Sequence, residues 1–88
     1  MKTEKKLEML EEIAPEAQVM NGFDNCIIGI CRRFGMDDIV LYDQTKVIEQ
    51  LMQDDMTQEE ALEYFSYNQI GAWVGDGTPA FAELFEKM

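Results

Sequence analysis

Histidine is absent from this 88-residue chain, and serine occurs once, at Ser66. The absence of histidine removes the most frequent general base and the most frequent metal ligand of enzymes. A serine or cysteine hydrolase is not expected, because no base lies near Ser66 in the sequence to activate its hydroxyl. The phosphate-binding patterns GxxxxGK[ST] and GxGxxG are also missing. The sequence therefore predicts a protein that is not an enzyme and that uses no cofactor and no metal.

Cysteine is scarce, with Cys26 and Cys31 as the only two thiols in the sequence. Two cysteines are too few for a disulfide framework. If both lie on one strand, their odd separation places them on opposite faces, where they do not pair. No CxxC motif points to redox chemistry. We expect free thiols that pack as small apolar side chains, as in the reducing cytoplasm.

Long apolar runs are missing as well. No stretch approaches the roughly 18 apolar residues of a membrane span. The basic start of the sequence, residues 1–6, is not followed by the apolar segment of a signal peptide. The sequence therefore predicts a cytoplasmic protein without a membrane partner.

Basic residues are few: 7 Lys and Arg stand against 18 Asp and Glu, and the net charge is −11. Between residues 36 and 76, ten acids accompany one base, Lys46, so this part alone carries −9. Such a field repels nucleic acid and anionic membranes and favours a basic partner. The simpler interpretation is a solvated surface that keeps the protein in solution.

Neighbouring carboxylates occur in three pairs that could bind Mg²⁺ or Ca²⁺, but none has the spacing of an EF-hand loop. The pairs are Asp37–Asp38, Asp54–Asp55 and Glu59–Glu60. Turn formation and solubility explain them more simply. A small carboxylate-dependent metal enzyme is kept as an alternative, with Tyr64, Tyr67 or Asn68 as further site residues.

The first predicted helix runs from Thr3 to Ile13. Thr3 is expected to cap it, and Leu7, Leu10 and Ala14 share one face. Pro15 ends or kinks this helix, because the residue before a proline is pushed out of the helical region.

Asn21-Gly22 predicts a type I′ hairpin, since both of its central positions need a positive φ. Residues 17–20 and 23–30 would be its two strands. The apolar, β-branched segment Cys26–Cys31 is typical of a buried strand. A helix is the alternative, because Ile27, Ile30, Cys31 and Phe34 also share a helical face that Gly35 would end.

The middle of the chain carries the clearest local signals. Residues 38–42 predict a strand, after which Asp43 caps a helix from Gln44 to about Gln53. A capping box formed by Thr57 and Glu60 then starts the next helix, which Asn68 is expected to end. The expected buried residues of the first of these helices are Val47, Ile48, Leu51 and Met52, and those of the second are Ala61, Leu62, Tyr64 and Phe65, with Met56 as a staple against Ala61.

A last strand is predicted at residues 70–75, with Trp73 in it, followed by a turn at Asp76-Gly77. Thr78-Pro79 is typical of a helix start. The spacing of Phe81, Leu84, Phe85 and Met88 predicts an amphipathic helix after it. The fold class is therefore α+β: a single domain, residues 1–88, with a three- to four-stranded antiparallel or mixed sheet packed by helices in the order α-β-β-β-α-α-β-α.

Several short segments resemble a group of small acidic proteins encoded by bacteriophages and prophages. The residues that carry the resemblance are Gly22-Phe23-Asp24, Ile27-Ile28-Gly29, Val40-Leu41-Tyr42-Asp43, Lys46, Ile48, Leu51-Met52, Glu59-Glu60-Ala61, Glu63-Tyr64-Phe65, Asn68, Gly71-Ala72-Trp73-Val74-Gly75 and Thr78-Pro79. The resemblance spans about Gly22 to Phe81. It implies an accessory protein made in a bacterial cytoplasm during infection, of the kind that inhibits host or defence proteins. It implies no catalytic residues.

The sequence thus favours a protein that binds a host or phage protein with a basic surface. Three alternatives stay open: a mimic of nucleic acid that occupies a basic cleft, the metal enzyme above, and a structural protein that self-assembles through its tail. The candidate partner-binding residues lie on the acidic helix and the tail: Asp54, Asp55, Glu59, Glu60, Glu63, Phe81, Leu84, Phe85 and Met88.

Overall fold

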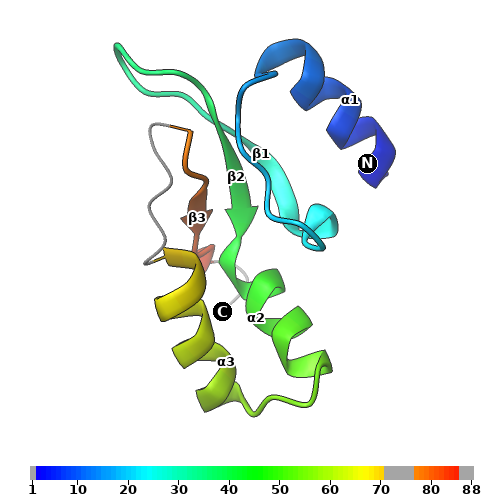
Figure 1. The fold of residues 1–88 in the computed structure, drawn as a ribbon, viewed down its shortest axis with the longest axis vertical. Helices are drawn as coiled ribbons and strands as arrows, with labels where there is room; N and C mark the ends of the chain where they lie inside the picture. Colours follow the sequence, from blue (N-terminus) through cyan, green and yellow to red (C-terminus); the bar gives the residue numbers. More distant parts are fainter. Residues whose placement is uncertain (1, 71–76, 86–88) are drawn as a thin grey trace.

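The fold is α+β, built on a three-stranded mixed sheet with three α-helices around it (Figure 1). A computed structural model describes residues 2–70 and 77–85. The strands are β1 (Ile27–Cys31), β2 (Ile39–Asp43) and β3 (Ala80–Ala82), and the helices are α1 (Thr3–Ile13), α2 (Gln44–Gln53) and α3 (Gln58–Phe65).

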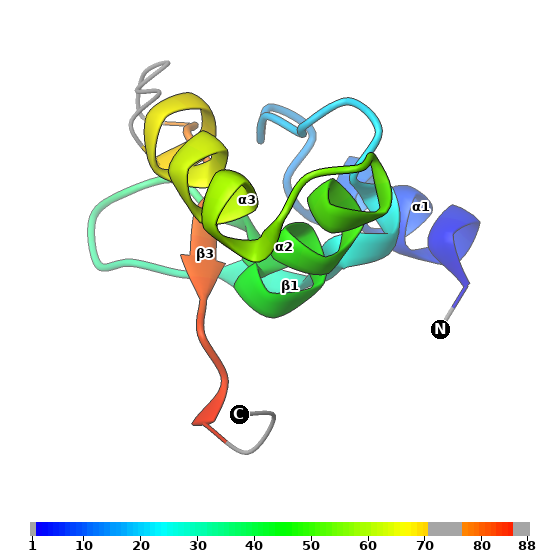
Figure 2. The same cartoon turned by 90° about the horizontal axis from the view of Figure 1, so that it is seen from below.

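Strand β2 is the centre of the sheet. It pairs antiparallel with β1, where Ile30 is opposite Val40, and parallel with β3, where Leu41 is opposite Ala80. Four of its five residues are buried, and a neighbouring strand lies along each of its two edges. Helix α1 lies on the β1 side of the molecule and β3 on the opposite side (Figure 2).

The core joins the sheet to α2 and α3, which pack side by side. Phe81 of β3 closes this core: its ring stacks on Tyr42 with centroids 5.7 Å apart and meets Phe65 edge-on at 4.9 Å. The buried core residues are Leu10, Cys26, Ile27, Val40, Tyr42, Val47, Ile48, Leu51, Ala61 and Phe65.

The two central helices begin where the sequence predicts. The Asp43 carboxylate accepts hydrogen bonds from the main-chain N–H groups of Thr45 and Lys46, so it caps α2. The capping box of α3 is complete, since Thr57 and Glu60 each accept the other's main-chain N–H. Asp55 separates the two helices with a positive φ of 69°, a conformation that aspartate tolerates in tight turns.

Helix α1 has the predicted bounds but not the predicted N-cap. Lys2 occupies the N-cap position, and no side chain caps the helix there. Thr3 is therefore the first helical residue and not the cap. Leu10 and Ala14 are buried as expected, whereas Leu7 stays partly exposed because α1 contacts the rest of the protein along a narrow strip.

The predicted hairpin at Asn21-Gly22 is wrong. Only Gly22 has a positive φ there (88°), and the Phe23 N–H bonds to the Met20 carbonyl, so the chain makes a turn that does not match type I′. The Met20 N–H is bound instead by the Tyr42 hydroxyl, and a short 3₁₀ turn follows at Asp24–Cys26. Residues 17–20 consequently form no strand.

The segment from Ile27 to Cys31 is a strand, which excludes the helical alternative for this region. Its partner β2 explains the outcome, because the ladder with β2 satisfies its backbone groups and buries Ile27. Three residues expected in the core, Met52, Leu62 and Tyr64, are exposed, since α2 and α3 each present only one narrow face to the core.

The chain after α3 differs most from expectation. Asn68 does not end the helix; a π-helical turn, Ser66–Ile70, continues it, and the Asn68 amide donates to the Tyr64 carbonyl at 3.2 Å. The helix expected after Pro79 is replaced by β3, because residues 80–82 pair with the open edge of β2. Of the strand predicted at residues 70–75, Ile70 ends the π-helical turn, whereas residues 71–75, with Trp73, lie outside the described residues, as does Met88.

No helix in the described part of the chain is long and apolar enough to cross a bilayer.

Candidate functional site

The outer face of α3 carries a stripe of acidic, aromatic and sulfur-containing side chains. The buried side of this helix, Ala61 and Phe65, fixes which positions face outward. Positions spaced by three and four residues then line one shallow hollow of about 370 Å³. We call these residues the α3 stripe: Met56, Glu60, Glu63, Tyr64 and Tyr67.

The local fold holds the two ends of the stripe. At the N-terminal end, the Thr57 N–H donates to the Glu60 carboxylate at 3.0 Å, which orients this side chain. At the other end, the π-helical turn carries Tyr67, whose side chain is 79% exposed. Single wide turns of this kind are frequent at functional sites of helical proteins.

The stripe is negatively charged at neutral pH. The Thr57 N–H, together with the Thr57 hydroxyl, lowers the pKa of the Glu60 carboxyl, so Glu60 stays ionised. Lys46 is the only basic residue between positions 44 and 67. The carboxylates of Glu60 and Glu63 therefore have no base on their own helix to neutralise them.

The side chains of the stripe offer groups for hydrogen bonding and for apolar contact. Two carboxylates accept hydrogen bonds and two phenol rings offer flat apolar faces, while Met56, which is half-buried against the core, adds an adaptable apolar contact at one end. Tyrosine and methionine are enriched at protein interfaces, where rigid rings contribute contact area at little entropic cost. Within residues 2–70 and 77–85, no group of three or more acids or cysteines is placed to hold a metal ion.

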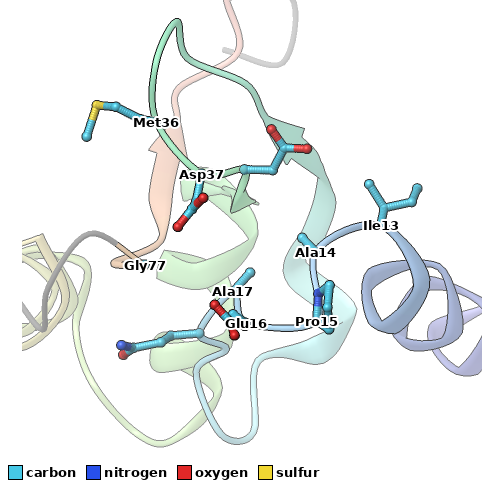
Figure 3. Close-up of a pocket in the computed structure, with 10 residues that line it drawn as sticks. Ile13, Ala14, Pro15, Glu16, Ala17, Met36, Asp37 and Gly77 are labelled. Carbon is cyan, nitrogen blue, oxygen red and sulfur yellow. The ribbon is translucent and has the colours of Figure 1, made fainter.

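A larger hollow, of about 520 Å³, lies between the segment after α1, the β1–β2 turn and Gly77 (Figure 3). Glu16 and Asp37 reach it from two different loops, while Met36 points away. Its acids have basic neighbours: Arg32 forms an ion pair with Asp38 at 3.3 Å. Arg33 donates to the Asp37 carbonyl at 3.4 Å. Of the two hollows, the one at the α3 stripe therefore has fewer basic side chains next to its acidic residues.

The structure brings together only part of the predicted partner-binding set. Glu60 and Glu63 share the hollow on α3. Asp54 and Asp55 are exposed in the turn between the helices, and Glu59 is exposed on α3, but none of these three lines the hollow.

The predicted tail site is divided. Phe81 belongs to the protein's own core, Leu84 is half-buried, and Phe85 is 84% exposed. Met88 is outside the described residues. Phe81, Leu84 and Phe85 therefore do not form the one apolar helical face that their spacing predicts.

The sequence prediction names Tyr64 and Tyr67 beside carboxylates only in the metal-enzyme alternative, and it leaves Tyr64, Tyr67 and Met56 out of the partner-binding set. The signal was present, because positions 56, 60, 63, 64 and 67 recur at intervals of three and four. Tyr64 was assigned to the core instead, since an aromatic residue in a helix is usually buried.

Comparison of the chain with protein-family models, with curated proteins and with solved structures found no match.

Proposed function

We propose that this protein is a non-enzymatic binding protein that docks through the α3 stripe onto an arginine-bearing basic surface of another protein. The observation that carries the proposal is the placement of Glu60, Glu63, Tyr64 and Tyr67 around one exposed hollow. The resemblance to phage-encoded proteins suggests the setting: a bacterial cytoplasm, a host or phage protein as partner, and inhibition or host takeover as the outcome.

Arginine is the side chain that fits the stripe best. Its planar guanidinium stacks on aromatic rings and forms paired hydrogen bonds with carboxylates. Lysine is a point charge that uses the carboxylates but gains less from the rings. The remaining negative charge of the molecule accelerates the encounter with a basic partner and makes association depend on salt.

A defined probe tests this chemistry directly. We would titrate isotope-labelled protein with an oligo-arginine peptide and with an oligo-lysine peptide of equal length, and follow the amide NMR signals. The largest changes are expected at residues 60–67, with several-fold tighter binding of the arginine peptide. Equal shifts at every acidic segment, or equal affinity for the two peptides, would count against the proposal.

Two charge reversals on the same helix provide a matched pair. Glu63→Lys places a base inside the hollow, whereas Glu59→Lys makes the same charge change on an exposed position outside it. Binding of the arginine peptide should fall about tenfold or more for Glu63→Lys and much less for Glu59→Lys. Glu60 is left unchanged, because it belongs to the capping box and its loss would weaken the helix.

The natural partner is sought with the same variants. Protein captured from bacterial lysates, with and without infection, should be retained by the native chain and by Glu59→Lys but lost with Glu63→Lys and with Tyr67→Ala. Retention by all four chains would contradict binding through the stripe. Displacement of the captured protein by duplex DNA would show that the basic surface is a nucleic-acid site, which is the outcome expected of a nucleic-acid mimic.

A further inference from the structure

The charged side chains of helix α1 are arranged against the direction that its own helix dipole favours. Three of the seven basic residues of the chain lie within its first turns. The first turn contains one acid, Glu4, and the last turn contains no base. Cations near the N-terminus and anions near the C-terminus are the reverse of what the helix dipole favours. The N-terminal half holds Lys2, Lys5 and Lys6, and the C-terminal half holds Glu8, Glu11 and Glu12.

Most neighbouring charges on α1 also fail to compensate one another; Lys5 and Glu8, three positions apart, are the exception. Positions four residues apart, which are adjacent on a helix surface, pair like with like, and each such pair is destabilising by a few tenths of a kcal/mol. These pairs are Lys2 with Lys6, Glu4 with Glu8, and Glu8 with Glu12. No charged side chain of α1 forms an ion pair with another described residue. Most charges of α1 therefore lack an opposite charge as a neighbour within one copy of the protein.

The same helix exposes apolar side chains next to these charges. Leu10 is its only buried residue. Met9 and Ile13, four positions apart on one flank, are 39% and 42% exposed. A shallow apolar hollow of about 200 Å³ lies beside Met9, between α1 and β1, with Ile28 in its lining. Ile28 itself is 38% exposed on this edge strand of the sheet.

We propose that two copies of this chain associate through α1, packed antiparallel about a two-fold axis near Met9. In this arrangement the basic half of each helix faces the acidic half of the other, so that Lys5 of one copy is opposite Glu12 of its partner. Met9 and Ile13 of both copies form the apolar seam, and Ile28 lies at its border. An interface of this kind is self-complementary, as two-fold symmetry requires, and it also sets the two helix dipoles antiparallel.

The flank is geometrically consistent with such a seam. Lys2, Lys5, Met9 and Glu12 follow one another at intervals of three and four residues, so they form one ridge along the helix. Glu11 is two positions from Met9 and projects from a different side of the helix. Helix α1 lies at the outside of the molecule beyond β1, and α3 is remote from it (Figures 1 and 2). The pairing thus leaves the α3 stripe free.

Charge reversal tests the proposal without touching the core. Sedimentation velocity of the full chain should show a concentration-dependent dimer that weakens with added salt. Lys5→Glu alone and Glu12→Lys alone should each weaken the dimer about tenfold or more, because like charges then meet across the axis twice. An equimolar mixture of the two variants should restore association as a heterodimer, in which both contacts are again between opposite charges. Glu11→Lys, the matched control, should leave the dimer unchanged.

Other outcomes would overturn the proposal. The native chain could sediment as a monomer up to about 1 mM. The mixed variants could fail to associate while circular dichroism shows both folded. Phe85→Glu could abolish the dimer while the α1 reversals leave it intact, which would assign association to the tail.

Discussion

Tyr42 connects three parts of the chain that are far apart in sequence. Its side chain is fully buried in the central strand. Its hydroxyl oxygen accepts a hydrogen bond from the Met20 N–H at 2.7 Å, and its ring stacks on Phe81. This one hydroxyl therefore ties the irregular segment after α1 to the sheet, and it satisfies a backbone donor that the predicted hairpin would have used.

Replacing Tyr42 by phenylalanine should lower the free energy of unfolding by about 1–2 kcal/mol, because the Met20 N–H loses its acceptor. Urea denaturation of both proteins measures the difference. Tyr67→Phe is the control: its hydroxyl is on an exposed side chain, and the change should stay within about 0.5 kcal/mol. Equal effects of the two substitutions would show that the Met20 contact contributes nothing.

Alkaline pH should act through the same hydroxyl. Burial raises the pKa of Tyr42 above its ordinary value of 10.0, although the Met20 hydrogen bond partly opposes the shift. The folded state therefore holds the phenol proton more tightly than the unfolded state. This stability is fully present below pH 10 and is lost as the pH rises through the folded pKa. Unfolding measured from pH 8 upward should show a steeper loss for the native chain than for Tyr42→Phe.

The two thiols differ in surroundings. Cys26 is fully buried, and its thiol donates to the Gln50 side chain at 3.5 Å. Burial raises the pKa of this thiol, with a smaller opposing effect from Lys46. Cys31 is half-buried at the end of β1. Alkylation of the folded protein, followed by peptide mass spectrometry, should therefore modify Cys31 well before Cys26; equal rates would mean that the fold opens at Cys26.

At the scale of elements, the described helices that begin as predicted are those whose start signals are local. Asp43 caps α2 and the Thr57–Glu60 box starts α3, and each signal operates within three or four residues. The acids of the α3 stripe were identified for the same reason. Its tyrosines were not included in the predicted partner-binding set, because their exposure depends on which side of α3 the rest of the protein covers.

Elements that depend on distant partners were predicted poorly. Asn21-Gly22 supports more than one kind of turn, and the choice rests on Tyr42, which binds the Met20 N–H from another part of the chain. The spacing of Phe81, Leu84 and Phe85 fits a helix, yet residues 80–82 pair with β2 instead. The helical spacing of three apolar residues is a weak preference. Pairing with the edge of β2, which the rest of the fold leaves unpaired, determines the local structure instead.

The buried N-cap of α2 should contribute more to the free energy of unfolding than a solvent-exposed N-cap does. Asp43→Ala removes a buried acceptor from two N–H groups, and we expect a loss of about 2 kcal/mol or more in the free energy of unfolding. Asp43→Asn keeps an oxygen acceptor and should lose clearly less. Thermal and urea denaturation measure both variants. Equal losses would show that the charge of Asp43, rather than the cap, is what stabilises this site.

At the scale of the whole molecule, the net charge of −11 works against compactness. Arg32 forms an ion pair with Asp38, but acids outnumber bases 18 to 7 in the sequence, so most of the acids have no base to offset their repulsion. Acidic residues favour an encounter with a basic partner, and the same residues oppose folding in dilute salt.

Raising NaCl from about 10 mM to about 150 mM should therefore increase the melting temperature, because the screening length shortens below the size of the molecule. Calorimetry at constant protein concentration measures the change. Phe85→Glu, which adds one further acid at an exposed site, should enlarge the salt dependence without altering the core. A melting temperature independent of salt would contradict the role assigned to repulsion.

Strand β3 also sets the order in which the molecule is completed during synthesis. It pairs in parallel with β2 only after the chain has passed through both α2 and α3, and it brings Phe81 onto Tyr42 and Phe65. A chain growing on the ribosome therefore has its central strand and both helices before the ring that covers them. Until residue 82 has emerged, this nascent protein presents two uncovered aromatic rings and an open strand edge, which is the interval in which a chaperone has most to bind.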